Sequence, residues 1–366
     1  MQGVFSQGVW SLSQRECVFV VPGDINTPTG GYIYDQKVIA ELRARGFSVS
    51  VLSLSNAFPN PSSADQRVAY EQLTRVGSKT PMIIDGLALG ALDPETVSAI
   101  SSSIIGMIHH PLAYETGLDA DTSKRLFETE FENLRKVEKV LVPSHFTKQL
   151  LVEKYQLDQA LISVATPGID FDPLPAQPAR PPLILSVGIM AFRKGHDVLL
   201  RALSKITEAS WQAVIVGQTR EQQYLDELLA LRAELGLEAR VKFLGHLNQK
   251  ELAQYYSKAT VFALATRHEG YGMVFAEAMA NGLPIVSCKA GATAETVGEQ
   301  AGIFTDIDSP ELFADALLQV IGDQKLQSRM SSASKLRASQ LGTWSDTAKV
   351  FEQALDEINK RENPLD

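Results

Sequence analysis

The feature that most constrains the fold is a regular alternation of short apolar runs with helix-like stretches, each run being followed by a turn signal. This alternation is typical of α/β units built around parallel sheets. The runs of the first half lie at residues 17–21, 47–54, 81–85, 103–109, 139–144 and 161–166. Those of the second half lie at 183–188, 211–217, 241–245, 260–266, 284–288 and 302–305.

A proline-rich stretch, FDPLPAQPARPP at residues 171–182, separates the two halves. Proline lacks the backbone donor that helices and sheets need, so this stretch is the best candidate for a linker. We therefore expect an α/β protein with two Rossmann-like, doubly wound domains that face each other across a cleft. The expected division is a poorly constrained tail at 1–16, one domain at 17–178 and a second at 179–343.

Length and charge agree with two soluble domains and exclude some function classes. A chain of 366 residues suits two domains, and its net charge of −9 argues against binding nucleic acid. Two distant cysteines, Cys17 and Cys288, match no metal or disulfide spacing and favour a reducing compartment. The start of the chain lacks the pattern of a signal peptide, and no apolar run is long enough to span a bilayer. A cytoplasmic protein is expected.

The first turn of the chain contains two adjacent glycines, Gly30 and Gly31, where the first strand passes into its helix. Glycines allow close approach of a ligand to the backbone, and a helix start offers free N–H groups to a phosphate. An ordinary strand-to-helix turn would give the same pattern. The G-x-G-x-x-G motif of dinucleotide-binding dehydrogenases is not present here.

A basic pair, Arg193 and Lys194, follows the run at 183–188 and precedes a helical stretch. Ligands of open α/β sheets bind at the carboxyl ends of the strands, where this loop should lie. A guanidinium fork and an ammonium group together suit a diphosphate without a metal ion. A solvated loop pair is the alternative.

The stretch RHEGYGMVFAEAMANGLP at 267–284 places one glutamate on a glycine-rich turn and another inside an apolar helix. The helix start near residues 271–274 is suited to bind a diphosphate through its free backbone N–H groups. Glu277 lies about one turn further along, where a buried carboxylate needs donors such as two ribose hydroxyls. Glu269 precedes the amides and would face groups beyond the phosphates. A loop glutamate and an ion-paired helix glutamate remain the alternative.

Three D-x-D triplets, at residues 119–121, 170–172 and 306–308, each offer a pair of carboxylates that could hold a metal ion. Each lies at a turn or before a helical stretch, which favours a structural role. We expect no metal site and no cofactor.

The pattern E-G-Y-G-x₄-E-A-M-A-x-G-x-P resembles the E-x₇-E signature of the retaining glycosyltransferases of family 4, which have the GT-B fold. The resemblance extends over roughly residues 17–358. It includes TGG at 29–31, His109, PSHFTK at 143–148, ATPGID at 165–170, SVGIMAFRKG at 186–195 and the helix beginning near Trp344. It departs at Tyr271, where phenylalanine is commoner, and at Ala265-Thr266, where Pro-Ser is commoner. By this resemblance, a helix at about 344–366 would return to the first domain.

The resemblance implies a hexosyl transfer from a nucleoside-diphosphate sugar, with a UDP-sugar favoured and a GDP-sugar next. The acceptor would be a saccharide or lipid-linked saccharide, in polysaccharide or glycoconjugate biosynthesis. The protein would be cytoplasmic, with transient association at the inner face of the membrane as an option. Polysaccharide-assembly proteins of bacteria show a stretch similar to HHPLAYET at 109–116.

The resemblance also assigns roles to residues. Catalysis would fall to His109, Arg193, Lys194 and Glu269. Acceptor contacts would come from His109, His110 and Glu115, with either histidine next to the reacting carbon. The donor would be bound by Gly30, Gly31, Gly188, Arg193, Lys194, Leu247, Glu269, Gly270, Tyr271, Gly272, Met273, Val274 and Glu277.

Two other functions fit the same architecture. A nucleotide-sugar epimerase of GT-B fold would need no separate acceptor. A non-catalytic sugar-nucleotide-binding subunit would typically lack Glu269, Arg193 or Lys194, and all three are present.

Overall fold

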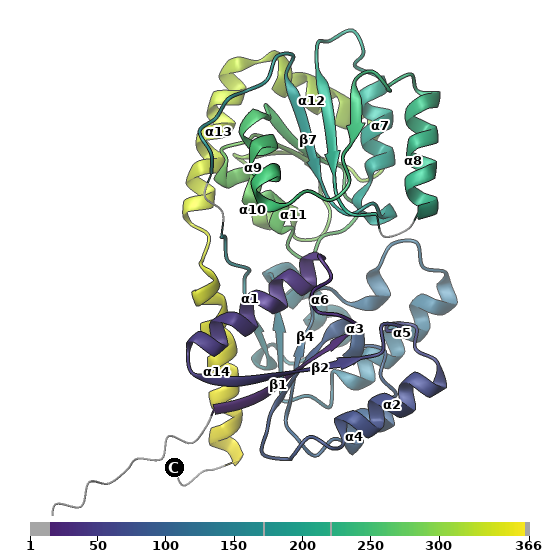
Figure 1. Cartoon of the computed structure of the whole chain (residues 1–366), viewed down its shortest axis with the longest axis vertical. Coiled ribbons are helices and arrows are strands. Elements are labelled where there is room, and N and C mark those ends of the chain that lie inside the picture. The colour runs from purple at the N-terminus through teal and green to yellow at the C-terminus, as the bar shows by residue number, and fades with distance from the viewer. Residues whose placement is uncertain (1–14, 171–172, 220–221, 363–366) are drawn as a thin grey trace, which may run out of the picture.

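A computed structural model describes residues 15–170, 173–219 and 222–362 of the chain. The described residues form two α/β units, each around a six-stranded parallel sheet, stacked one above the other (Figure 1). All twelve expected strands are present. Residues 1–14 of the expected tail lie outside the described residues, and the first strand begins at Arg15.

The first domain contains strands β1 (Arg15–Pro22), β2 (Phe47–Leu54), β3 (Met82–Asp85), β4 (Ile104–Met107), β5 (Lys139–Val142) and β6 (Ile162–Val164). Its helices are α1 (Gly30–Ala44), α2 (Ser63–Leu73), α3 (Gly86–Leu89), α4 (Pro94–Ala99), α5 (Ala120–Asn133) and α6 (His145–Tyr155), with 3₁₀ turns η1 (Leu112–Tyr114) and η2 (Gln159–Leu161). The strand order is β2-β1-β3-β4-β5-β6. The order therefore reverses between β1 and β3.

The second domain contains strands β7 (Leu183–Val187), β8 (Gln212–Val216), β9 (Val241–Phe243), β10 (Val261–Leu264), β11 (Ile285–Cys288) and β12 (Gly302–Thr305). Its helices are α7 (His196–Ser204), α8 (Gln222–Glu234), α9 (Gln249–Lys258), α10 (Met273–Ala280), α11 (Thr293–Val297), α12 (Pro310–Gly322) and α13 (Gln324–Ser339), with the 3₁₀ turn η3 (Phe192–Lys194). The order β12-β11-β10-β7-β8-β9 reverses between β7 and β10. This reversal point is where open α/β sheets bind ligands.

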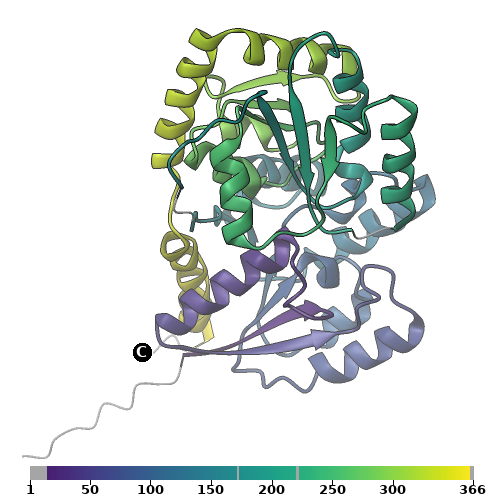
Figure 2. The ribbon, with the colours of Figure 1, turned by 45° about the horizontal axis from the view of Figure 1, so that its top comes forward.

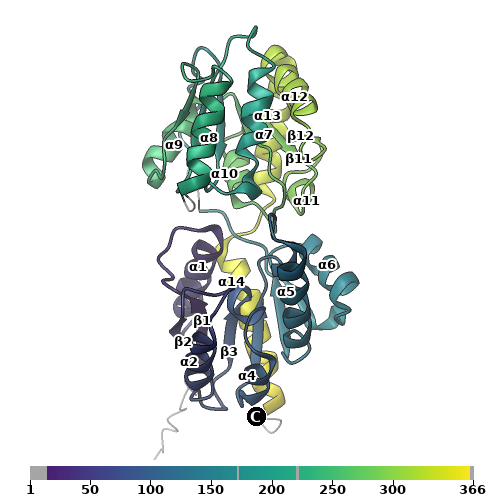
Figure 3. The ribbon, with the colours of Figure 1, turned by 90° about the vertical axis from the view of Figure 1, so that its right-hand side faces the viewer.

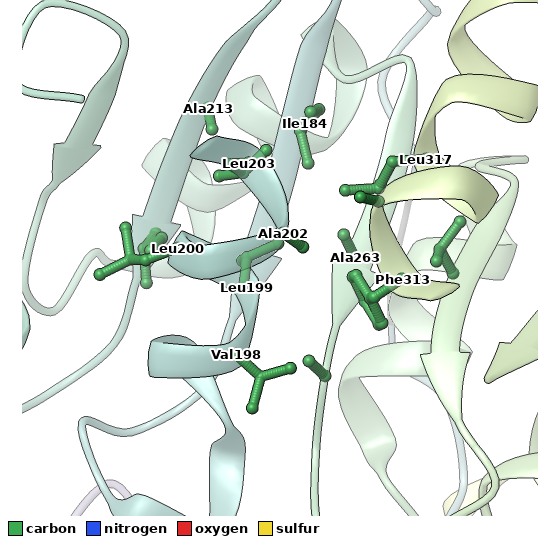
Figure 4. Close-up of a cluster of buried hydrophobic side chains, with 14 of the residues drawn as sticks. Ile184, Val198, Leu199, Leu200, Ala202, Leu203, Ala213, Ala263, Phe313 and Leu317 are labelled. Atoms are coloured by element: carbon green, nitrogen blue, oxygen red, sulfur yellow. The ribbon is translucent and has the colours of Figure 1, made fainter. Parts of the chain in front are cut away.

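Helices cover the sheet of the second domain with close-packed apolar side chains. Figure 4 shows α7 and α12 meeting over the strands, with Leu199, Leu203 and Phe313 pointing into the shared layer. These side chains are fully or almost fully buried. Burial of each leucine contributes about 1.5–3 kcal/mol, so this layer fixes the strand ends that carry the site.

The last helix, α14 (Trp344–Glu362), leaves the second domain and lies alongside the first, next to α1 (Figures 1 and 3). Trp344 is buried against the ring of Tyr34 of α1, with ring centroids 5.5 Å apart. A Cβ at Gly168 would lie 2.0 Å from the Trp344 backbone nitrogen, so only glycine allows this crossing. The expected return of the last helix is confirmed, and residues 363–366 lie outside the described range.

Figure 2 shows the α1 end that carries Gly30 reaching the loops of the second domain. The proline-rich stretch packs on the second domain, where Gln177 N donates to Ser257 O at 2.7 Å and Ala179 N to Lys258 O at 2.9 Å. Residues 171 and 172 of this stretch lie outside the described residues.

Candidate functional site

The candidate site lies where the loops after β7 and β10 meet, at the reversal point of the second sheet. Gly195 ends the first loop with φ of 64°, and a Cβ there would lie 1.9 Å from the carbonyl oxygen of Ala265. Only glycine fits both the left-handed backbone and this approach. The loop with the basic pair is thus pressed against the end of β10.

Hydrogen bonds fasten the two loops together. The Arg193 carbonyl accepts from Arg267 N at 2.8 Å and from the Thr266 hydroxyl at 3.0 Å. The Arg267 guanidinium also binds both carboxylate oxygens of Asp197 at the start of α7, at 2.9 and 2.8 Å. Such two-point ion pairs fix geometry, so the loops behave as one rigid platform.

Glu269 and the basic pair form a buried charge network on this platform. Lys194 Nζ donates to Glu269 Oε1 at 2.6 Å, and Arg193 Nη1 lies 3.7 Å from Oε2. Burial acts to raise the pKa of Glu269, but Lys194 and Arg193 outweigh burial and hold that pKa below its usual range. Burial lowers the pKa of Lys194, against the opposing effect of Glu269. The three side chains that the sequence singled out therefore lie together.

The first domain adds two side chains to this network from the loop after β4. Glu115 Oε1 lies 3.3 Å from Arg193 Nε, and Glu115 Oε2 lies 3.1 Å from His110 Nε2. Partial burial acts to raise the pKa of Glu115, but His110 and Arg193 bring that pKa down to about 2. The neighbouring His268 has a pKa lowered to about 4 by burial and by the charges of His110 and Arg193. Glu115 is thus an anion held against Arg193 from across the domain junction.

The start of α10 lies beside this network, where the place of a Cβ on Gly272 is 3.6 Å from Glu269 Cγ. Gly272 is the N-cap with φ of 85°, and no side chain of the described residues caps the helix start. The first N–H groups of a helix have no partner within the helix and favour an anion. Met273 reaches the first domain, where its Cε is 3.6 Å from the place of a Cβ on Gly30. The starts of α1 and α10 therefore converge at the domain junction.

Glu277 lies one turn into α10 and is partly exposed between buried neighbours. Its Oε2 accepts a hydrogen bond from the Tyr256 hydroxyl at 2.9 Å. Burial raises the pKa of Glu277 to about 7, which the Tyr256 hydroxyl offsets only in part. Burial therefore makes this carboxyl harder to ionise than a free one, and a further donor to it would favour the charged form.

Gly270 brings the two domains into direct contact. A Cβ at Gly270 would lie 2.1 Å from the His109 carbonyl oxygen, and the Ser144 hydroxyl donates to the Gly270 carbonyl at 2.6 Å. Glycine is therefore required at this point of the E-G-Y-G turn because of tertiary packing. The same contact places the backbone of His109 next to the turn.

Other expected donor residues surround this centre less directly. Gly188 lies under the Lys194 side chain, whose Cγ and Cδ are 3.3 Å from the place of a Gly188 Cβ. Val274 follows Met273 in the first turn of α10. The Tyr271 side chain is buried, and its hydroxyl has no hydrogen-bond partner among the described residues. Leu247, after β9, packs against the core of the second domain.

Sequence reasoning missed four side chains near this centre. Asp35 and Asp85 are buried beside His109. Ser144 binds Gly270, and the Glu295 carboxylate accepts from the backbone N–H groups of His145 and Phe146 at the start of α6, at 2.9 and 2.8 Å. One signal was visible: Asp85 ends an apolar strand at the edge where the site lies. The others depend on contacts between distant segments.

The D-x-D aspartates have structural partners instead. Asp119 caps α5 by accepting from Thr122 N at 2.9 Å. Asp170 pairs with Lys37 at 2.6 Å, and Asp308 pairs with Arg267 at 2.8 Å. One aspartate of each triplet thus has a hydrogen-bond or ion-pair partner within the fold.

Comparison with known proteins finds a family model that matches the second half of the chain. Residues 172–337 match the model of the glycosyl transferases group 1 family. A D-inositol 3-phosphate glycosyltransferase of Xylanimonas cellulosilytica is 29% identical over 229 residues, which cover 58% of this chain and 55% of that protein. A mannosylfructose-phosphate synthase of Agrobacterium fabrum is 27% identical over 246 residues, covering 62% and 54%. The chain thus matches about half the length of these relatives.

Solved structures share the fold over nearly the whole chain. A sucrose-phosphate synthase of Thermosynechococcus elongatus has a TM-score of 0.77 at 19% identity, covering 94% of this chain and 99% of that chain. Anabaena HepE in complex with UDP and glucose has a TM-score of 0.75 at 19% identity, with the same coverage. The expected GT-B fold is confirmed, as is the resemblance to glycosyltransferases. Within the described residues, no helix combines the length and apolarity needed to cross a membrane.

Proposed function

We propose that this chain, whose residues 172–337 match the model of the glycosyl transferases group 1 family, moves a hexosyl unit from a nucleoside-diphosphate sugar to a hydroxyl group of an acceptor. One observation carries the proposal: Arg193 and Lys194 converge with the uncapped start of α10 at the reversal point of the second sheet. Two cations and a helix start together form a fixed positive field suited to a diphosphate. The UDP complex of HepE, a protein of the same fold, supports a donor of this class.

The donor would extend along α10 and its preceding turn. The diphosphate would take the amides of Gly272 to Val274, and the ribose hydroxyls would donate to Glu277, whose pKa burial raises to about 7. The transferred sugar would lie beside Glu269 and Gly270. Glu269 is well placed to accept from sugar hydroxyls, since Lys194 and Thr266 already fix its orientation.

The chemistry requires stabilisation of a leaving nucleoside diphosphate. Charge accumulates on the phosphate bridge as the bond to the sugar breaks, and the preorganised cations Lys194 and Arg193 stabilise that charge. This task needs no metal, so we expect the reaction to persist in a chelator. The departing phosphate would take the proton of the acceptor hydroxyl on the same face of the sugar, which retains the anomeric configuration.

The acceptor would approach from the first domain, where His109, His110 and Glu115 lie at the junction. We propose a saccharide or a lipid-linked saccharide as acceptor and a role in polysaccharide or glycoconjugate biosynthesis. A UDP-sugar is the first choice of donor and a GDP-sugar the second. We place the protein in the cytoplasm, with transient association at the inner face of the membrane.

The test is a panel of radiolabelled UDP-, GDP- and ADP-hexoses incubated with purified protein and a library of saccharide and lipid-linked acceptors. We expect acceptor-dependent release of nucleoside diphosphate, a labelled product with retained configuration, and no loss of rate in EDTA. Lys194→Ala and Glu269→Ala should each cost at least about 2–3 kcal/mol in transition-state stabilisation, a loss of about 30-fold or more. Lys205→Ala is the matched control, because Lys205 pairs with Glu311 at the end of α7.

The alternatives give different products in the same panel. An epimerase would convert the labelled donor without any acceptor, and a non-catalytic subunit would bind a donor without turnover. Wild-type turnover by both Lys194→Ala and Glu269→Ala would refute the assignment of these residues.

A further inference from the structure

Two carboxylates lie buried directly behind His109. Asp35, in α1, and Asp85, at the end of β3, are 0% and 1% exposed. His109 Nε2 lies 3.1 Å from Asp35 Oδ1 and 3.5 Å from Asp85 Oδ2. The neighbouring order β1-β3-β4 brings these three segments together at one edge of the sheet.

The burial of two neighbouring carboxylates demands a positive partner. Asp35 Oδ2 has no hydrogen-bond partner among the described residues. Leu87 N donates to Asp85 Oδ1 at 2.8 Å. Taking an ionised carboxylate out of water is costly, and an adjacent imidazolium offsets part of that cost.

Charge coupling follows the same geometry. Burial acts to lower the pKa of His109, but Asp35 and Asp85 outweigh burial and raise that pKa above 6.5. Burial and the charge of Asp35 raise the pKa of Asp85 to about 7. Burial also raises the pKa of Asp35, which His109 opposes, and Asp35 is the nearer of the two carboxylates to the ring.

Packing fixes which edge of the ring faces inward. The Cδ2 and Nε2 atoms of His109 lie 3.3 and 3.5 Å from the place of a Cβ on Gly31. Tyr34 meets the ring edge-on at 5.1 Å, and its hydroxyl donates to the Ala165 carbonyl at 2.6 Å. Nε2 is thus committed to the carboxylates. Nδ1 is the remaining nitrogen of this side chain, which is 21% exposed, and the backbone carbonyl of His109 lies against Gly270 of the second domain.

We propose that Asp35 and Asp85 are positioning residues that hold His109 as an imidazolium, so that Nδ1–H donates to a hydroxyl oxygen of the sugar bound beside Gly270. The inference rests on the proposed function for the identity of that ligand. No proton is transferred in this role: His109 fixes the sugar through one charged hydrogen bond, and the carboxylates fix His109.

The titratable groups near the His109 ring are Asp35 and Tyr34 from α1 and Asp85 from β3. The pair of His110 and Glu115 follows His109 in the same loop. The donor atoms of Asp35, Asp85 and His109 also lie within 4.8 Å of one another, close enough to reach one cation. The test therefore also asks whether these three side chains bind a metal ion.

The direct test is an NMR titration of ¹⁵N-histidine-labelled full-length protein, with His109→Gln used to assign the His109 signals. In the wild type, His109 should titrate above 6.5 with Nε2 protonated throughout. In Asp35→Asn the midpoint should fall by about one pH unit or more, because the nearest opposite charge is removed. Asp85→Asn should change the midpoint less, since Asp85 already carries a proton for part of the range.

Kinetics with the sugar nucleotide give the second readout. At a pH between the His109 midpoints of the wild type and of Asp35→Asn, the variant should lose at least about tenfold in kcat/KM. It should recover as the pH falls and the ring regains its proton. Its affinity for UDP, which lacks the sugar, should change less than threefold, because the groups that bind the diphosphate are untouched. A purely structural role would instead lower the rate equally at every pH.

Several results would overturn the inference. These are a His109 midpoint at or below 6.5 in the wild type, a pH-independent loss in Asp35→Asn, and broadening of the His109 signals by Mn²⁺ at stoichiometric concentration. Transfer activity with an ordinary His109 titration would reject this inference and leave the proposed function standing. Absence of transfer with every donor would reject the proposed function. The NMR midpoints would then still show whether Asp35 and Asp85 keep His109 charged.

Discussion

Replacing Glu277 by glutamine should make the ligand-free protein more stable and the nucleotide complex weaker. Glu277 accepts a hydrogen bond from the Tyr256 hydroxyl at 2.9 Å, and burial raises the pKa of its carboxyl to about 7. The folded state therefore binds this proton more tightly than the unfolded state does. Stability from this group is present below pH 4.5 and is lost as the pH rises from 4.5 to about 7.

The stability change on replacing Glu277 follows from the difference between its pKa in the unfolded chain, 4.5, and in the folded protein, about 7. One pKa unit is worth about 1.36 kcal/mol, so ionisation of Glu277 would cost at most about 3 kcal/mol at pH 8. Glu277 is partly exposed, and solvent screening reduces this to about 1–2 kcal/mol. Glu277→Gln removes the charge and keeps an acceptor for Tyr256, so it should gain about that amount at pH 8 and nothing at pH 4.5.

Binding should change in the opposite direction. Hydrogen bonds from two ribose hydroxyls to a carboxylate are worth about 1.5–3 kcal/mol, so the variant should bind UDP about 10- to 100-fold more weakly. Urea denaturation at pH 4.5 and 8 measures the first effect, and isothermal titration calorimetry with UDP measures the second. Glu234→Gln, an exposed change near the end of α8, is the matched control.

The reasoning is refuted if Glu277→Gln is less stable than the wild type at pH 8. It is equally refuted if the variant binds UDP with unchanged affinity. Loss of binding together with loss of stability would indicate a structural role for Glu277.

Three further predictions test the domain junction. Gly270→Ala should abolish transfer while leaving the far-ultraviolet circular dichroism unchanged, because its Cβ would meet the His109 carbonyl at 2.1 Å and hold the domains apart; normal activity would disprove the close approach. Glu295→Gln should weaken the cap on α6 by about 1 kcal/mol and speed hydrogen exchange at the start of that helix, with unchanged exchange as the contrary result. Glu115→Gln should bind UDP up to about fivefold more tightly in calorimetry, because the diphosphate no longer competes with Glu115 for Arg193, and weaker binding would contradict this.

Local sequence pattern was enough to predict the strands and the approximate place of the ligand-binding loops. The apolar runs marked all twelve strands, because strands buried in parallel sheets need apolar side chains throughout. The sequence Asn281-Gly282 also predicted the end of α10 correctly: Asn281 is the C-cap, and Gly282 has φ of 70°.

What the pattern could not show depends on the order of strands within each sheet. Asp35 and Asp85 are 50 positions apart, and each by itself resembles an ordinary helix or turn residue. They meet at His109 only because β1, β3 and β4 are neighbours. Gly270 likewise resembles a turn glycine, whereas its requirement comes from the other domain.

The most direct measurement is a crystal structure of the protein soaked with UDP or a UDP-sugar. The account predicts the diphosphate within hydrogen-bond distance of Lys194, Arg193 and the first amides of α10, with the ribose hydroxyls on Glu277. A nucleotide bound elsewhere, with the seat beside Glu277 unoccupied, would contradict it.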